Sequence, residues 1–394
     1  MKKRTVRIMK LLSVLLVFPL LSISFFLPLS AQDTTMSINT AVGQFDCKSA
    51  ILMEASTGKI LYEQNPDEAL PPASVTKVMT LLLVMEAIEE GRLHWEDPIT
   101  ASAHACSMGG SQIFLKEGEQ MSAEDMIKSV VIASANDAAV ALAEHLEGTE
   151  DAFVTKMNQR ARELGMKNTR FENTNGLDDT VTEHVTSARD IAIMSGELLK
   201  HEKITEYSSI WMDTIRNGEF GLTNTNRLVR FYKGATGLKT GSTSKAGFCI
   251  SATAKRDDMS LICVIMGALS RDIRNAAATA LLDWGFANFT RRCFPAKKCG
   301  TISVSGGIAT EVSVSCSEYS VVISKRDANR IETVSELPES VEAPVEAGQE
   351  IGEMIYRLDG EELGRCPVLA DESVKKIGFW DIFVRLLEII VMNL

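Results

Sequence analysis

Three short strings, far apart along the chain, constrain its fold most, because they carry side chains that act together only when brought into one place. A capping serine beside a solvated lysine, an ordinary helix cap and a solvated strand lysine are the simpler interpretations of each string alone. Their joint occurrence in this order predicts a fold that assembles one site from a helix, a loop and a strand. The strings are Ser74-Val75-Thr76-Lys77, Ser134-Ala135-Asn136 and Lys239-Thr240-Gly241.

The first string has the spacing of a nucleophile and its base. An apolar helix is predicted over 74–90, so Ser74 lies at its start, where free N–H groups stabilise developing negative charge. Lys77 follows three residues later and returns to the same face. Serine needs an adjacent base, and lysine serves when it is neutral. Burial among apolar neighbours and a second cation, Lys239, both favour the neutral form.

The other two strings supply groups that handle a substrate. A hydroxyl at Ser134 can relay a proton, and the amide of Asn136 can hold a substrate carbonyl. Lys239 and Gly241 face one way on a predicted strand, and Thr240 faces the other. Gly241 allows a substrate backbone to approach, as an added edge strand would. Lysine and threonine together bind a carboxylate, which predicts a substrate with a free C-terminus.

The first residues of the chain have the pattern of a secretory signal. Basic residues precede an apolar run that ends near Ser30 and Ala31. Pro19 and Pro28 interrupt this run, which argues against a regular spanning helix. We therefore predict export with cleavage near Ala31; an uncleaved N-terminal anchor is the alternative.

The last residues, 375–394, are strongly apolar but carry three ionisable side chains. Asp381, Arg385 and Glu388 are spaced four and three apart, so on a helix they form one narrow polar stripe. A spanning helix needs about 20 mainly apolar residues and disfavours such charges. The pattern predicts an amphipathic helix in the membrane surface; a helix packed in the protein core is the alternative.

Charge and cysteine content exclude several classes of partner. The net charge is −11 and no basic tract follows the signal region, so nucleic acid is not expected. The eight cysteines form no CxxC pair and no Cys/His set with the spacing of zinc ligands, so we expect no metal and no other cofactor. Cys249 and Cys263 lie in apolar strand-like runs and are expected to be buried. Cys293 and Cys299 could form a disulfide, which the sequence leaves open.

Hydrophobic patterning predicts an α+β protein with one antiparallel sheet flanked by helices. Beyond about Pro295 the pattern changes to short alternating strands, which predicts a small β-domain. The expected elements are a hairpin over 48–64, helices over 74–90, 187–200 and 274–289, helical patterns over 122–147 and 150–164, and strands within 235–268.

With these segments in place, the chain resembles the serine D-alanyl-D-alanine carboxypeptidases, the low-molecular-mass penicillin-binding proteins. The resemblance runs from about residue 45 to the C-terminus and includes PPASVTKVMT, SANDAAVALAEH, FENTNGLDD, HVTSARDIA and GLKTGSTSKAGFCISATA. It implies the penicillin-binding/β-lactamase-like transpeptidase fold, followed by an all-β domain and a C-terminal amphipathic helix. The expected parts are a signal peptide (1–31), a carboxypeptidase domain (32–292), a β-rich domain (293–371) and an anchoring helix (372–394).

The same resemblance implies the reaction. Ser74 would be acylated by the penultimate D-alanine of a peptidoglycan stem peptide, releasing the terminal D-alanine, with Lys77 as general base and Ser134 as proton relay. β-Lactams would acylate the same serine, and the backbone N–H groups of Ser74 and Ser242 would form the oxyanion hole. The enzyme would act at the outer face of the cytoplasmic membrane. The expected substrate-binding residues are Asn136, Lys239, Thr240, Gly241, Ser242 and Arg274.

Other functions remain to be weighed against this one. A class A β-lactamase needs a glutamate in an E-x-x-L-N loop, which is missing, and Glu172 has the wrong register. A non-catalytic scaffold that binds stem peptides is disfavoured because no motif residue is lost. Endopeptidase action on cross-links stays open, although the clamp of Lys239, Thr240 and Arg274 favours a carboxypeptidase. We expect His184 to be structural.

Overall fold

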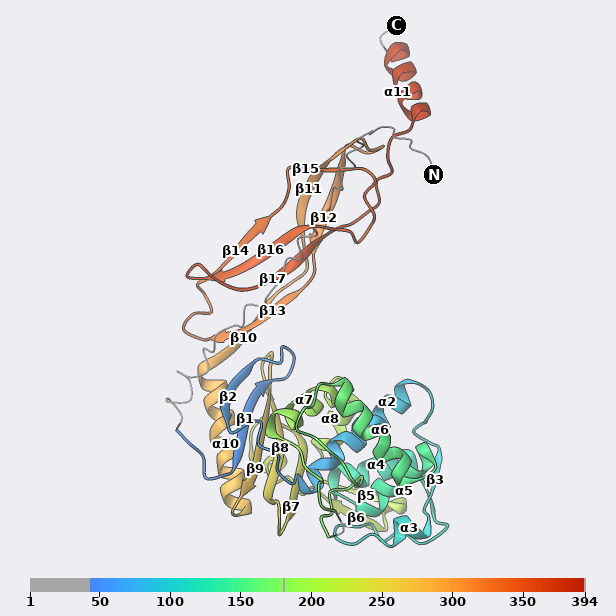
Figure 1. Ribbon diagram of the computed structural model, residues 1–394, viewed down its shortest axis with the longest axis vertical. Helices are drawn as coiled ribbons and strands as arrows, with labels where there is room; N and C mark the ends of the chain where they lie inside the picture. Colours follow the sequence, from blue (N-terminus) through green and yellow to red (C-terminus); the bar gives the residue numbers. More distant parts are fainter. Residues whose placement is uncertain (1–42, 180, 393–394) are drawn as a thin grey trace, which may run out of the picture. The chain divides into compact units, whose positions relative to one another are not determined.

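The computed structural model describes residues 43–179 and 181–392, so the predicted signal segment lies outside the described residues. Its central feature is a five-stranded antiparallel sheet in the order β2-β1-β9-β8-β7, with β7 at one edge (Figure 1). This topology confirms the predicted antiparallel sheet. The strands are β1 (Ser49–Glu54), β2 (Ile60–Gln64), β7 (Ala235–Thr243), β8 (Gly247–Arg256) and β9 (Met259–Ala268).

Helices cover both faces of this sheet, with α10 on one face and the remaining large helices on the other (Figure 1). The larger helices are α2 (Lys77–Glu89), α4 (Ala123–Ile132), α5 (Asn136–Glu147), α6 (Glu150–Glu163), α7 (Ala188–Leu198) and α10 (Arg271–Asn288). The shorter elements are η2 (Ala73–Thr76), α3 (Ala103–Cys106), α8 (Lys203–Ser208), η3 (Arg216–Gly218), α9 (Leu228–Phe231), β3 (Pro98–Thr100), β4 (Gln120–Ser122), β5 (Met212–Ile215) and β6 (Phe220–Thr223).

The two-residue period of the strands explains why the sheet needs cover on both faces. In β1, Ile51 and Met53 pack in the cluster that contains α2 and α7. The alternate residues Ala50 and Leu52 pack in the cluster that contains α10. Successive side chains point to opposite faces, so a strand that is apolar at every position requires two apolar layers.

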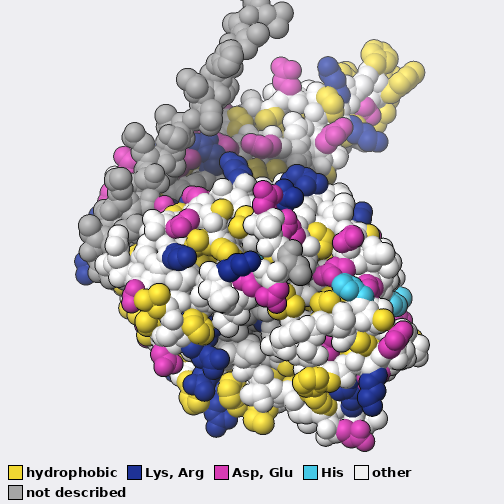
Figure 2. Space-filling model, turned by 60° about the horizontal axis from the view of Figure 1, so that its bottom comes forward, with side chains coloured by type: hydrophobic (Ala, Val, Ile, Leu, Met, Phe, Trp, Pro, Cys, Tyr) yellow, Lys and Arg dark blue, Asp and Glu magenta, His cyan; other side chains and the backbone are white. Residues whose placement is uncertain are grey.

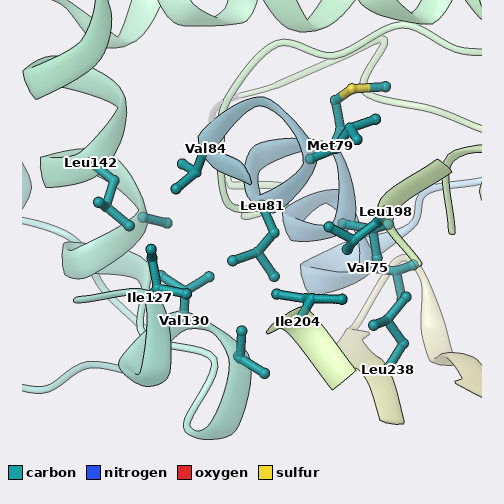
Figure 3. Packing of buried hydrophobic residues seen from close by; sticks show 14 of the residues in the cluster. Val75, Met79, Leu81, Val84, Ile127, Val130, Leu142, Leu198, Ile204 and Leu238 are labelled. Carbon is teal, nitrogen blue, oxygen red and sulfur yellow. The ribbon is translucent and has the colours of Figure 1, made fainter. Parts of the chain in front are cut away.

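Helix α2 lies inside the larger cluster and is buried along most of its length. Figure 3 shows Leu81 of α2 among apolar side chains of the surrounding elements. Because α2 follows directly from η2, this packing fixes the position of the turn that carries Ser74. The labelled neighbours come from α4 (Ile127, Val130), α5 (Leu142), α7 (Leu198), α8 (Ile204) and β7 (Leu238).

The helical pattern predicted over 122–147 is divided into two helices in the structure. Helix α4 ends at Ile132 and α5 begins at Asn136. Between them Ser134 has a φ of +63°, in the left-handed region that terminates a right-handed helix. The break places Ser134 and Asn136 at the junction instead of within a continuous helix.

The C-terminal part is the predicted small β-domain. Its main sheet has the order β14-β16-β17-β12-β11-β15, and β10 pairs with β13 separately. Alternating side chains such as Val312, Val314 and Cys316 form its core. The strands are β10 (Phe289–Phe294), β11 (Lys297–Ser305), β12 (Glu311–Cys316), β13 (Tyr319–Ser324), β14 (Ile331–Glu336), β15 (Ser340–Glu342), β16 (Glu350–Leu358) and β17 (Glu361–Ala370).

The predicted C-terminal helix is present as α11 (Phe379–Met392). Its large apolar side chains are exposed, including Phe379 at 74% and Trp380 at 73%. This exposure favours the predicted amphipathic helix. Over the ranges 43–179 and 181–392, the structure has no helix that combines the length and apolar character needed to cross a membrane.

Candidate active site

Ser74 lies in the 3₁₀ turn η2, directly before α2, at the wall of a cavity. The prediction placed it at the start of the helix, and the structure adds a tighter turn ahead of that start. Buried neighbours in the same segment, Ala73, Val75 and Thr76, anchor the turn. The hydroxyl of Ser74 thus lies on a rigid element, and the backbone N–H of Ser74 lies just before the N-terminus of α2.

Lys77 is fully buried, and its amine contacts three oxygen atoms. The Nζ atom is 2.9 Å from Ser74 Oγ, 2.5 Å from Asn136 Oδ1 and 2.8 Å from the carbonyl oxygen of Asn175. Burial, followed by the nearby charge of Lys239, holds the pKa of Lys77 well below its usual range. A neutral amine has two N–H donors and one lone pair. It can therefore donate to the two carbonyl-type oxygens and accept the proton of Ser74.

Ser134 and Lys239 form a second buried pair beside the first. Lys239 Nζ donates to Ser134 Oγ at 2.8 Å and to the Thr240 carbonyl oxygen at 3.0 Å. Burial, and then the charge of Arg274, lowers the pKa of Lys239 to about 7. The structure thus brings the second and third sequence strings into direct contact, and it holds Ser134 through Lys239.

Asn136 supports Lys77 more directly than the sequence predicted. Its Oδ1 accepts from Lys77, and its Nδ2 donates to the Gly109 carbonyl oxygen at 2.6 Å. The amide is therefore already engaged with protein groups on both sides. The next residue, Asp137, is buried and accepts hydrogen bonds from the backbone N–H groups of Ile113 and Leu115. The sequence analysis missed this carboxylate, which fixes the loop along the site.

The expected carboxylate-binding residues converge on the same cavity. Thr240 donates from Oγ1 to Thr225 Oγ1 at 2.8 Å, and Ser242 is exposed two residues farther along β7. Arg274 is 3% exposed and donates to the Cys249 carbonyl oxygen and to Asn275 Oδ1. Burial, with the like charge of Arg271, lowers the pKa of Arg274 to about 10, which leaves it cationic at neutral pH.

Gly241 is required by the packing of the protein itself. A Cβ atom there would lie 2.7 Å from the backbone nitrogen of Ser74 and 2.8 Å from the carbonyl oxygen of Pro72. The prediction gave Gly241 the task of admitting a substrate backbone. The structure shows that its missing side chain also lets β7 lie directly against the turn that carries Ser74.

Six of the predicted residues line a cavity of about 670 Å³, whereas Lys77, Asn136 and Lys239 are buried and do not line it. Acidic and basic side chains are interspersed on the face shown in Figure 2, whereas the described residues that line the cavity include three arginines and no carboxylate. Such a cavity favours an anionic ligand. Its lining combines predicted residues (Ser74, Ser134, Thr240, Gly241, Ser242, Arg274) with residues that sequence reasoning missed (Ser111, Trp211, Thr223, Asn224, Thr225, Arg227, Phe231, Arg271).

His184 lies behind η2, the turn that carries Ser74, and its contacts fit the structural role that we expected for it. Its Nδ1 accepts from the Glu172 N–H at 3.0 Å, which assigns the ring proton to Nε2. Nε2 then donates to Thr76 Oγ1 at 2.7 Å, and that hydroxyl donates to the Ala73 carbonyl oxygen. Burial lowers the pKa of His184 to about 4, so the ring is neutral near pH 7.

Comparison with known sequence families identifies the chain. The family described as D-alanyl-D-alanine carboxypeptidase matches residues 34–270. The chain belongs to this family. A second family, described as the C-terminal domain of penicillin-binding protein 5, matches residues 291–376.

Individual members of the carboxypeptidase family are similar over most of the chain. The D-alanyl-D-alanine carboxypeptidase DacF of Bacillus subtilis is 43% identical over 341 residues, which cover 85% of this chain and 87% of the relative. The structure of penicillin binding protein 5 from Haemophilus influenzae has a TM-score of 0.77 at 32% identity, covering 85% of this chain and 99% of that one. An ampicillin-bound penicillin-binding protein from Listeria monocytogenes has a TM-score of 0.57 at 31% identity, covering 61% and 98%.

Family membership and geometry both disfavour the β-lactamase alternative. The Glu172 carboxylate accepts hydrogen bonds from the backbone N–H groups of Thr182 and Glu183. It is thus committed to its own loop, and it does not line the cavity of Ser74. Among the described residues, no cluster of three or more His, Cys, Asp or Glu side chains is arranged to hold a metal ion.

Proposed function

We propose that this serine-type D-alanyl-D-alanine carboxypeptidase acts on peptidoglycan stem peptides through an acyl-enzyme on Ser74. The observation that carries the assignment is the fully buried amine of Lys77, 2.9 Å from Ser74 Oγ. A lysine whose pKa is lowered by burial can take a proton that an exposed, charged lysine could not.

In the acylation step, Ser74 Oγ transfers its proton to Lys77 Nζ and attacks the carbonyl carbon of the penultimate D-alanine. The C–N bond then breaks, and the proton held by Lys77 passes through the hydroxyl of Ser134 to the leaving amine of the terminal D-alanine, which leaves Lys77 neutral. In deacylation, water gives a proton to Lys77 and adds to the acyl carbon. The ester bond breaks, and Ser74 Oγ recovers its proton.

The remaining cavity residues position the peptide. Lys239, Thr240 and Arg274 would hold the terminal carboxylate, and the backbone N–H groups of Ser74 and Ser242 would stabilise the oxyanion. The position of β7 at the edge of the sheet supports this role, because an edge strand has backbone groups free to pair with an extended peptide.

The test measures free D-alanine released from diacetyl-Lys-D-Ala-D-Ala by the purified protein. Release by the native chain and its loss in Ser74→Ala would support the assignment. Ser303→Ala, an exposed serine on β11, is the matched control and should retain release. A folded native chain that releases no D-alanine and forms no penicilloyl adduct would contradict the proposal. Release from a cross-linked dimer of stem peptides would add the endopeptidase activity.

The second part of the proposal concerns inhibitors and location. β-Lactams would acylate Ser74, which the ampicillin-bound relative supports. We also infer export by the segment 1–31 and attachment to the outer face of the cytoplasmic membrane through 375–394. The exposed apolar side chains of α11 support this attachment. The carboxypeptidase domain would then span 32–292, the β-rich domain 293–371 and the anchor 372–394.

A further inference from the structure

Two cysteines of the β-domain are brought together by an irregularity in strand pairing. Strands β11 and β12 are antiparallel, with Lys297 opposite Cys316. The register shifts between Lys298 and Gly300, so Cys299 is an extra residue in β11. Cys316 lies opposite Lys297, two residues before Cys299, so the two cysteines are diagonal neighbours across the strand pair.

The two sulfur atoms approach the same backbone carbonyl oxygen. Cys299 Sγ and Cys316 Sγ are each 3.7 Å from the Lys297 carbonyl oxygen. Two thiols that share one acceptor lie on the same side of the strand pair, where rotation of the side chains can bring the sulfur atoms together.

From this geometry we propose that Cys299 and Cys316 are a disulfide-forming pair that closes when the exported protein meets a disulfide oxidant. The pair is a different one from Cys293 with Cys299, which the sequence left open. Cys293 lies on β10, opposite Ser320 of β13, and its side chain is exposed.

Exposure sets the order of the reaction. Cys299 is partly exposed and Cys316 is buried, so Cys299 is the thiol that an oxidant reaches first. Its thiolate attacks a low-molecular-mass disulfide such as oxidised glutathione and releases one glutathione thiol. The Cys316 thiolate then attacks Cys299 Sγ and releases the second. Two electrons and two protons pass from the cysteine pair to the oxidant.

Cys366 is the competing partner for Cys316. It lies on β17, which pairs with β12, and two residues from Val368, the residue opposite Cys316. Its Sγ, however, donates to the carbonyl oxygens of Ser317 and Pro367 at 3.6 and 3.7 Å. The Cys366 thiol therefore shares no acceptor with Cys316, whereas the Cys299 thiol does, and the structure favours Cys299.

The experiment uses the full chain, purified in reductant and then transferred to oxidised glutathione. Free thiols are blocked with iodoacetamide and the protein is digested without reduction for peptide mapping by mass spectrometry. We expect loss of two of the eight thiols and one cross-linked peptide that joins Cys299 to Cys316. Cys293→Ser is the matched control and should give the same cross-link, whereas Cys299→Ser should give none.

Thermal unfolding gives an independent readout. The oxidised native chain should unfold at a higher temperature than the reduced chain, and reductant should reverse the shift. Cys299→Ser should show no such shift. Eight free thiols after oxidation would overturn the proposal. Cross-links that join Cys293 to Cys299 or Cys316 to Cys366 would overturn it equally.

Discussion

Substitution of Gly241 by alanine tests whether the close approach of β7 fixes the nucleophile. The new Cβ would lie 2.7 Å from Ser74 N, 2.8 Å from Pro72 O and 2.9 Å from Val75 N. Ordinary contacts begin near 3.4 Å, so the turn and strand must separate by about 0.7 Å. All three atoms belong to the backbone, so no side-chain rotation relieves the contact. Overpacking of this kind costs about 1–3 kcal/mol of stability.

The same displacement should reduce activity, because a shift of about 1 Å in a catalytic group costs roughly 10²-fold in rate. We therefore expect Gly241→Ala to remain folded and to release D-alanine roughly 10²-fold more slowly, with slower acylation by penicillin. Gly221→Ala is the matched control, since a Cβ at Gly221 meets nothing within 4 Å. A Gly241→Ala enzyme with native rates and native stability would refute the argument.

The remaining predictions concern the base, the carboxylate site, the buried histidine and the C-terminal helix. Lys77→Met should lower the rate of D-alanine release by about 10²–10⁴-fold and block penicilloylation, which fluorescent penicillin labelling checks. Because charged Lys239 is needed to bind the carboxylate and its pKa is about 7, kcat/KM should fall above pH 7. This fall should be absent in Lys239→Arg; a basic limb that persists in that variant would contradict the assignment. The pKa of His184 is lowered to about 4 in the folded chain. Protonation on unfolding should therefore make stability fall from about pH 6.5 towards 4, and calorimetry should find this loss absent in His184→Phe. Trp380→Asp on α11 should reduce the fraction of protein that co-sediments with anionic lipid vesicles, and it should leave the release of D-alanine from a soluble peptide unchanged.

Sequence patterns predicted those features that depend on local periodicity. The apolar run within 48–64 predicted a strand of the hairpin, and the apolar run after Ser74 predicted the central helix. The spacing of Ser74 and Lys77 predicted their contact, since residues three apart on a helical turn share a face.

Contacts between distant segments were beyond such reasoning. The third partner of Lys77 is the backbone carbonyl of Asn175. Every residue has a backbone carbonyl, so no sequence pattern marks this one as a partner. Thr225 reaches Thr240 only because the chain folds back beside β7. The sequence offered a helix cap at Ser134, but the helical pattern over 122–147 did not show the left-handed φ that follows the end of α4 there.

The burial of Lys77 lowers the stability of the folded chain, although the site depends on this residue. Because burial lowers the pKa of this amine, the unfolded chain binds a proton more tightly than the folded chain, and this difference lowers the free energy of unfolding. Selection for thermal resistance alone, without selection for turnover, should therefore replace this lysine early, together with Lys239. In libraries of this chain selected by heat alone, substitutions should therefore accumulate at Lys77 and Lys239.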